Sequence, residues 1–575
     1  MSVITSKSSL LSILKTSSGT PRNSLNRVRF QLPSNIRNIF LDFKSGANTK
    51  EYENLVCTIR DSEISDNELL SLLIEVKNCT SLLNYDLRLF VQALILVKWS
   101  HRGDNVVMSY QEFINNLISA HSCHIKLVVD QLIKLFLCSE PTDWIGSQPT
   151  EQALKRFNNI HLILQSTLIT VPMSEDILID TIKHNFPYFN ALACKQLSYF
   201  SNMLKVIQYQ ADLRINILQI AVDKLLLMDV HSPREEILQY EENSDDIMYE
   251  IEVDQIEKTD KDAMKHPVAN TLDLMMDVMF HFIKSECFVD GKFTKSKSME
   301  LYNDLMIVFE NVILPTHDCH HVQYLMFYIC SFDPSIANDF LKFLWRNVVL
   351  PNVSPVIRQT AVSYVSSFLA RADYLAVGYL KSYLIKFSDW IHNYIICHDS
   401  VTDFQFDFKQ HCVFYSICQA MFYLIAFRHQ DLVNSSVKLV FLQSLNLGKI
   451  VSCKLNPLKY CLSTIVDNFA AVTRAYQLAY CYTIIENNAR GSVPVVGRGG
   501  QYIINSVVNM YFPFDPYVLL RTCIHINPLY REYKSTLKPE IAHLSAKKER
   551  LYSGTEDEDD FIKDEVSFEG NDIPF

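Results

Sequence analysis

Apolar side chains return with the period of an α-helix through most of the chain. Within residues 211–228, Leu218, Ala221, Val222 and Leu225 lie at i, i+3, i+4 and i+7. Strand-like alternation is scarce, and the 575 residues include only 13 Gly, fewer than turn-rich β folds or Gly-lined nucleotide folds need. The period and the composition together predict an all-α protein.

Helix pairs recur at roughly 40 residues, the size of a HEAT or armadillo repeat. One pair begins with Ser354-Pro355, a helix N-cap and a first-turn proline, followed by Val356-Ile-Arg-Gln-Thr-Ala361. Proline, then Val/Ile-Arg, then Ala on the next turn is how many inner HEAT helices start. We therefore predict a HEAT-repeat-like α-solenoid, in which stacked helices build one continuous core.

Shifts in composition divide the chain into a folded body and three irregular segments. We expect residues 1–48, which are basic and Ser/Thr-rich, to form a mobile tail, and 49–545 to form the solenoid. Residues 232–266 should interrupt the solenoid as a disordered acidic loop, and 546–575 should form a disordered acidic tail.

Charge is concentrated in those irregular segments. Residues 235–265 carry twelve Asp/Glu against three Lys, 556–565 carry seven against one, and 1–41 carry six Lys/Arg and no acid. These segments together hold −9 of the net charge of −11, so the body is nearly neutral. A neutral body does not hold nucleic acid by counterion release, which leaves at most weak direct DNA binding through a local patch.

The sequence predicts a particular local structure for each of three segments of the body. Residues 455–488 should form two packed helices, the second buried on most sides because 478–485 has almost no polar face. Tyr511-Phe-Pro-Phe-Asp-Pro-Tyr517 should be a stiff aromatic strap. Residues 410–427 lack Lys, Arg, Asp and Glu, but Gln419 and its polar neighbours favour a buried helix over a membrane span.

No motif points to catalysis, a metal or a cofactor. His317-Asp-Cys-His-His321 is the one cluster of metal-type ligands, and we interpret it as a helix start after Pro315 with Cys319 packed inside, because only His317 and His321 have converging spacing. The fifteen Cys never occur as Cys-x-x-Cys, which indicates buried thiols in a reducing compartment. We expect neither enzymatic activity nor a cofactor.

Two short motifs lie in the predicted tails. Val28 and Phe30 fit a basic-Val-x-Phe pattern by which phosphatase partners are docked as an added strand, or they anchor the tail to the body. Ser553 and Thr555 each have Glu three residues downstream, which suits an acid-directed kinase. An unmodified, solvated tail is the alternative for that second motif.

Several ungapped blocks closely resemble the growth-regulated initiation factor family specific for RNA polymerase I. They include "LNPLK.CL", "FAA.T..YQL", "CYTIIE" and "FPFDPYVL" in the C-terminal half of the chain. Further blocks occur from Pro21 to Phe30, at His266–Ala269 followed by Leu272-Asp-Leu, at Leu314–His317 with Cys319-His320, and at Ile357–Gln359, Ser367–Ala372, Phe414–Ala420 and Glu558–Lys563.

The resemblance implies a HEAT-repeat factor without catalytic activity. Such a factor binds RNA polymerase I at its stalk and dock region, bridges it to the promoter selectivity complex on ribosomal DNA, and acts in the nucleus and nucleolus. Regulatory kinases and phosphatases switch it, the free factor can form a homodimer, and no membrane is involved. The block Leu369, Ala370, Arg371 and Ala372 resembles a segment implicated in contact with the promoter complex, although Asp373 follows where a basic residue is expected.

Two other classes of function remain open on the sequence. A HEAT-type transport adaptor would bind a small GTPase or signal peptides, and a phosphatase scaffold would depend on Val28 and Phe30. An unrecognised enzyme would need a deep polar pocket with perturbed ionisable groups.

Overall fold

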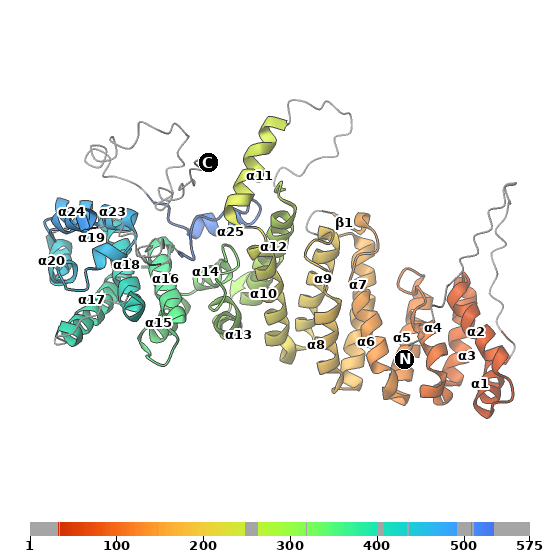
Figure 1. Ribbon diagram of the computed structural model, residues 1–575. Helices are drawn as coiled ribbons and strands as arrows, with labels where there is room; N and C mark the ends of the chain where they lie inside the picture. The colour runs from red at the N-terminus through yellow and green to blue at the C-terminus, as the bar shows by residue number, and fades with distance from the viewer. Residues whose placement is uncertain are drawn as a thin grey trace, which may run out of the picture. The chain divides into compact units, whose positions relative to one another are not determined.

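The structure, a computed structural model, describes residues 33, 35–145, 148–247, 263–317, 319–399, 408–433, 436–491, 508 and 511–533. Helices make up most of it (Figure 1). Strands in the described ranges are confined to two small antiparallel hairpins, β1 (Trp144–Ile145) with β2 (Gln148–Pro149) and β3 (Phe288–Val289) with β4 (Lys292–Phe293). The all-α prediction is confirmed.

The chain folds as two compact units. The first contains the residues up to Leu135 together with Lys155–Leu178, and the second contains Phe136–Leu154 and the chain from Ile179 onward. The helices of the first unit are α1 (Ile36–Ser45), α2 (Thr49–Asp61), α3 (Asp66–Asn78), α4 (Arg88–Ile95), α5 (Asp104–Ala120) and α6 (Ile125–Lys134), and the two units share α7 (Glu151–Thr170) and α8 (Ser174–Asn185).

The second unit is the larger and holds the long C-terminal half. Its first helices are α9 (Ala193–Lys205), α10 (Arg214–Val230), α11 (Arg234–Ile247), α12 (Pro267–Cys287), α13 (Lys295–Val308), α14 (Tyr324–Cys330), α15 (Pro334–Val349), α16 (Pro355–Arg371), α17 (Val377–Asp399) and α18 (Cys412–Phe427). The remaining helices are α19 (His429–Val433), α20 (Ser436–Ser444), α21 (Leu447–Val451), α22 (Pro457–Tyr460), α23 (Ser463–Ala475), α24 (Tyr482–Gly491) and α25 (Cys523–Ile526). Short 3₁₀ turns flank several of them.

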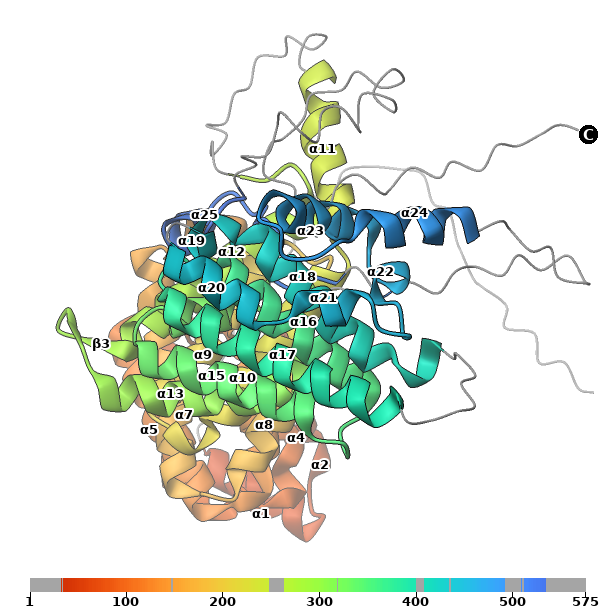
Figure 2. The same cartoon turned by 90° about the vertical axis from the view of Figure 1, so that its left-hand side faces the viewer.

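Neighbouring helices stack along the second unit as the repeat pattern predicts. Helix α16 packs between α15 and α18, and α18 also contacts α17 and α23 (Figure 2). Ser354 caps α16, its hydroxyl accepting a hydrogen bond from the Ile357 N–H at 3.4 Å, as expected for a HEAT inner helix. The solenoid prediction is confirmed.

Helix α18 is the most buried of these elements. Every residue from Val413 to Phe427 is buried, and the ring of Phe422 stacks on that of Phe469 of α23 with centroids 4.3 Å apart. The predicted buried helix is therefore present. None of the helices in the described ranges has the length and apolar character needed to span a membrane.

The expected irregular segments differ from the structure at their edges. Helix α1 starts at Ile36, inside the expected tail, because Ile36 and Phe40 bury completely in the first unit. Helix α11 occupies the start of the expected acidic loop. It forms because Ile237 is buried and because the Lys265 backbone N–H and ammonium group donate to Glu241 at 2.8 Å each.

The expected buried second helix of the 455–488 stretch is wrong. Helix α23 does bury one face, with Ile465 and Phe469 fully covered. The chain then turns at Gln477, which has a φ of 53°, and α24 keeps most of its surface in solvent. Tyr480, which precedes α24, is 92% exposed, so its apolar character does not reflect burial within this unit.

Candidate functional site

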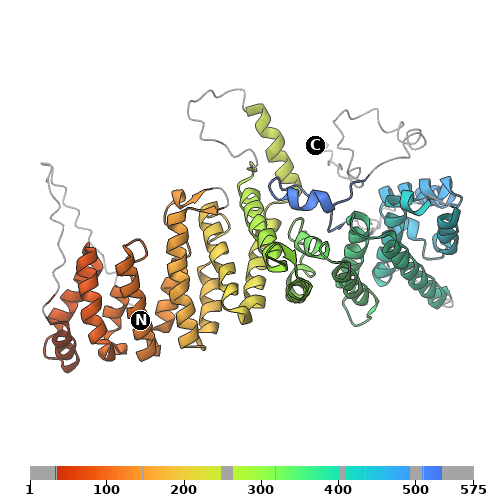
Figure 3. The ribbon, with the colours of Figure 1, turned by 180° about the vertical axis from the view of Figure 1, so that it is seen from behind.

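Residues 511–533, the C-terminal strap, run back across the second unit. The strap carries α25, which lies beside α12 although more than 200 residues separate them in the chain (Figure 3). Apart from α25 and the turn that follows it, the strap is extended or bent rather than helical, as its prolines predict.

Aromatic side chains fasten the first part of the strap. Phe514 is fully buried, and its ring centroid lies 5.1 Å from that of Phe327 and 5.3 Å from that of Tyr324. Its backbone N–H donates to the Ser367 hydroxyl at 3.0 Å. The hydroxyl of Tyr324 donates to the carbonyl of Asp515. Ring packing and satisfied polar groups together hold this segment on α14 and α16.

Asp273 of α12 anchors the middle of the strap. Its buried carboxylate accepts hydrogen bonds from the Arg521 N–H at 2.7 Å, the Thr522 N–H at 3.0 Å and the Thr522 hydroxyl at 2.6 Å. Burial raises the pKa of Asp273, and these hydrogen bonds oppose the rise. The strap that Asp273 holds thus explains why an acid is buried on α12.

Arg371 fastens the end of the strap. Its guanidinium carbon lies 4.8 Å from the ring centroid of Phe427 and 5.1 Å from that of Tyr530. The guanidinium also donates to the carbonyl of Arg531 at 3.3 Å, and the Arg531 N–H returns a 2.7 Å bond to the carbonyl of Arg371. A buried cation is tolerated here because π faces and carbonyl oxygens surround it.

The structure places the predicted promoter-complex residues inside the protein. Leu369, Ala370, Arg371 and Ala372 are each at most 1% exposed. The strap pairs with two of them, Arg371 and Ala372, through Tyr530. Contact of this block with the promoter complex stays a prediction. Asp373, the acid that replaces an expected basic residue, forms an ion pair with Arg531 of the strap at 2.5 Å.

The end of the His317–His321 stretch folds around Asp229. The buried Asp229 carboxylate accepts hydrogen bonds from the N–H groups of His320, His321 and Val322 at 2.8 to 3.1 Å, and lies 2.8 Å from Nδ1 of His321. Burial alone would raise the pKa of Asp229, but His321 and these donors outweigh it and lower the pKa.

Cys319 is buried as expected, and its burial raises the pKa of the thiol to about 12. The expected helix start after Pro315 is wrong, because α14 begins only at Tyr324. Among the described residues, a different group could hold a metal ion: Asp277, His281 and His525.

Four predicted site residues lie outside the described residues: Val28, Phe30, Ser553 and Thr555. The structure does not test them, and they stay predictions.

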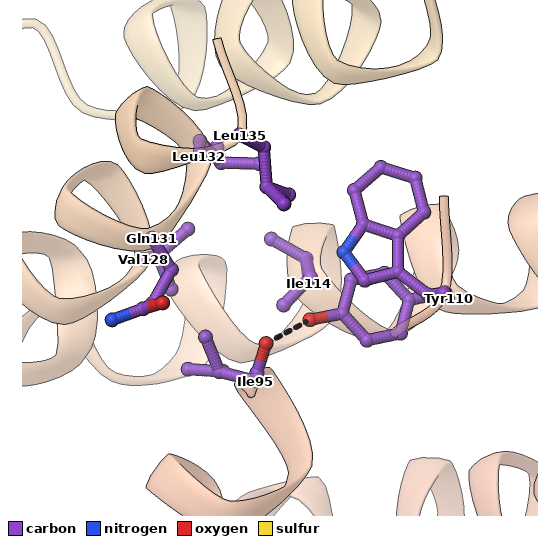
Figure 4. A pocket seen from close by; sticks show the side chains of 8 residues that line it. Ile95, Tyr110, Ile114, Val128, Gln131, Leu132 and Leu135 are labelled. Carbon is purple, nitrogen blue, oxygen red and sulfur yellow. Dashed lines mark hydrogen bonds between the residues drawn. The ribbon is translucent and has the colours of Figure 1, made fainter. Parts of the chain in front are cut away.

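A cavity of about 10 Å³ lies in the first unit, between α5 and α6 (Figure 4). That volume holds about one water molecule. Trp99, Tyr110 and Leu132 line it, and the Tyr110 hydroxyl donates to the carbonyl of Ile95 at 3.2 Å. This cavity is too small and too apolar to bind an organic substrate.

Comparison with known proteins gives one consistent result. The model of the family "RNA polymerase I specific transcription initiation factor RRN3" matches residues 31–538. The RNA polymerase I-specific transcription initiation factor RRN3 of Mus musculus is 33% identical over 562 residues, covering 92% of this chain and 85% of the mouse protein. The corresponding factor rrn3 of Schizosaccharomyces pombe is 27% identical over 530 residues, covering 86% of this chain and 85% of that protein.

A solved structure shares the fold. The crystal structure of RNA polymerase I transcription initiation factor Rrn3 matches with a TM-score of 0.67 at 20% identity, covering 86% of this chain and 97% of that one. The family model spans both units and the strap, and the mouse relative is similar along nearly its whole length. The chain therefore belongs to the RRN3 family of RNA polymerase I specific transcription initiation factors.

Proposed function

We propose that this chain binds RNA polymerase I at its stalk and dock region and bridges it to the promoter selectivity complex on ribosomal DNA. The family match over residues 31–538 carries the proposal, because it covers the whole helical scaffold rather than one segment. Membership in a family of initiation factors makes the chain a transcription factor and not an enzyme, with a function in the nucleus. Within the nucleus, we place it in the nucleolus.

Protein contacts, rather than DNA phosphates, are the proposed basis of recruitment. The body outside the charged segments carries almost no net charge, so counterion release contributes little. Stacked helices instead offer long faces for protein partners. Direct DNA binding is weak in this proposal.

The contact with the promoter complex involves the strap. Leu369, Ala370, Arg371 and Ala372 are buried, and the strap pairs with the last two of them. A partner therefore reaches this region through that segment of the strap. That segment is defined by the antiparallel bridge between Ala372 and Tyr530 and by the 3.0 Å bond from the Asp373 N–H to the carbonyl of Leu529. The role of the four buried residues is then to fix the strap in position.

Phosphorylation of the C-terminal segment regulates the factor in this proposal. Ser553 and Thr555 lie beside the acidic run of residues 556–560, where a phosphate adds to an existing negative charge. Regulatory kinases and phosphatases are therefore partners as well, and the free factor can pair with a second copy.

Affinity purification of the tagged chain from nuclear extract, with and without phosphatase treatment, tests the proposal. We expect RNA polymerase I subunits to copurify, with a yield that changes on treatment. Import factors or a phosphatase under both conditions, with polymerase I under neither, would favour a HEAT-type transport adaptor or phosphatase scaffold instead. In the scaffold case, changing Val28 and Phe30 to Ala would abolish phosphatase recovery.

A further inference from the structure

Asp273, Asp277 and His281 form a polar row along α12 that faces the strap. They follow one another at i, i+4 and i+8, so they lie on one side of the helix. Asp273 binds the strap backbone at Arg521 and Thr522. The other two members lie close to His525 of α25.

The three side chains converge with ligand-like geometry. The Asp277 Oδ1 atom lies 3.2 Å from Nε2 of His525 and 3.2 Å from Nδ1 of His281. All three ligand atoms lie within 4.8 Å of one another. Atoms bound to one tetrahedral zinc ion at its usual bond lengths are about 3.3 Å apart. Two edges of the site already have that length.

The distance between the ligand nitrogens of His281 and His525 can shorten because the exposed ring of His281 has room to rotate. The side chain of His281 is 65% exposed, whereas those of Asp277 and His525 are 14% and 16% exposed. Without a metal, His281 Nδ1 lies 2.9 Å from the carbonyl oxygen of its own turn, that of Asp277. When a metal ion binds Nδ1, the ring proton lies on Nε2, the contact with the carbonyl is broken, and the ring turns toward His525.

The surroundings fix His525 in place. Its ring centroid lies 5.2 Å from that of Phe280 and 5.8 Å from that of Tyr328. The two aromatic rings and the Asp277 carboxylate hold His525 in a fixed orientation. The exposed His281 supplies the third ligand. Surface His–Asp pairs that lie on a single helix have no such second element.

We propose that Asp277, His281 and His525 bind one divalent transition-metal ion, with zinc as the preferred species, and that the ion fastens the strap to α12. Two imidazoles and one carboxylate suit zinc and its neighbours in the first transition series, while magnesium and calcium prefer oxygen ligands. Water fills the remaining coordination position. Metal binding links two parts of the chain that are 244 residues apart, from His281 to His525.

Titration of the full-length protein with Co²⁺, after removal of metals with a chelator and under a phosphine reductant that contains no thiol, tests the site. We expect one equivalent to bind with visible d–d absorption and without the near-ultraviolet band of a cobalt thiolate, and Zn²⁺ to displace it. His281→Ala and His525→Ala should each weaken binding by about tenfold or more. His281→Ala is the decisive variant because an exposed side chain can be removed without loss of the fold.

His184→Ala is the matched control. His184 lies four residues after Asp180 on α8, with its Nδ1 2.6 Å from the Asp180 carbonyl, so it copies the local pair without the strap histidine. It should leave the binding unchanged.

A second readout is amide exchange at residues 522–526, which should slow on addition of Zn²⁺ in the wild type but not in His281→Ala. Three results would each overturn the proposal: no saturable binding, equal binding by His281→Ala and the wild type, or a cobalt–thiolate band showing that cysteines are the ligands.

Discussion

The guanidinium carbon of Arg371 lies 5.1 Å from the ring centroid of Tyr530, which joins the end of α16 to the last described segment of the strap. The two residues are 159 positions apart in the sequence. Their contact buries a segment that the sequence suggested as a surface for partners. At this contact the strap lies over the end of α16.

Arg371→Met should loosen the strap while keeping the length of the side chain. The variant loses the cation–π contacts and leaves the carbonyl of Arg531 without this donor. The free energy of unfolding should therefore fall by about 2 to 4 kcal/mol. Hydrogen exchange at residues 529–533 should speed up accordingly. Arg346→Met is the control, because exposed Arg346 lies over the Phe343 ring at 5.6 Å and its loss should change stability by less than about 1 kcal/mol.

Asp273→Asn should release the middle of the strap. The amide side chain keeps the size of the carboxylate but cannot accept all three of its hydrogen bonds, so exchange of the Arg521 and Thr522 amides should rise by about tenfold or more. Asp339→Asn, on the exposed face of α15, should leave those amides unchanged. Equal exchange in both variants and the wild type would show that Asp273 does not hold the strap.

The N-cap of α15 should make stability depend on pH. Asp333 accepts hydrogen bonds from the hydroxyl and the N–H of Ser335 at 2.6 and 2.7 Å, which lower its pKa to about 2. A carboxyl group whose pKa is lowered on folding stabilises the folded state at pH values above its unfolded-state pKa of about 3.9. This stabilisation is lost as the pH falls toward about 2.

Asp333→Ala should therefore cost about 1 kcal/mol at pH 6 and progressively less below about pH 4. Urea unfolding at several pH values measures this difference. Ser354→Ala removes the cap of α16, which has no ionisable group, so its cost should not change with pH. A constant cost for Asp333→Ala would contradict the lowered pKa.

Changing both Ser553 and Thr555 to Ala should abolish the effect of phosphatase on polymerase recovery. Without the two hydroxyls, no phosphate can form there, so treated and untreated samples should give equal yields. Ser567→Ala is the control in the same segment, because Gly570 rather than an acid lies three residues downstream. A phosphatase effect that persists in the double variant would show that the regulatory phosphorylation lies elsewhere in the chain.

Local sequence patterns predicted the parts of the fold that depend on local physics. Helical periodicity predicted α16 and α18, and the Ser354-Pro355 pair predicted the start of α16, because caps and apolar faces act within a few residues. The prolines of the strap predicted its irregular backbone. The exposure of α24 was missed, since an apolar run does not reveal whether another element covers it.

The contacts of the strap were not predictable in the same way. Asp273 meets Thr522 at a separation of 249 residues, and Asp277 meets His525 at 248. No periodicity connects such positions, because chain topology brings them together. A signal was nevertheless present: the acids at 229 and 273 have apolar neighbours in the sequence, and a buried acid requires donors from elsewhere in the fold.

Direct binding between purified components tests the central proposal. The full chain, immobilised through a tag, is incubated with purified RNA polymerase I or, as a control for specificity, with RNA polymerase II. We expect retention of polymerase I alone, and further recovery of the promoter selectivity complex through the bound factor when that complex is added. Retention of neither polymerase, or of both equally, would contradict a specific bridging role for this chain.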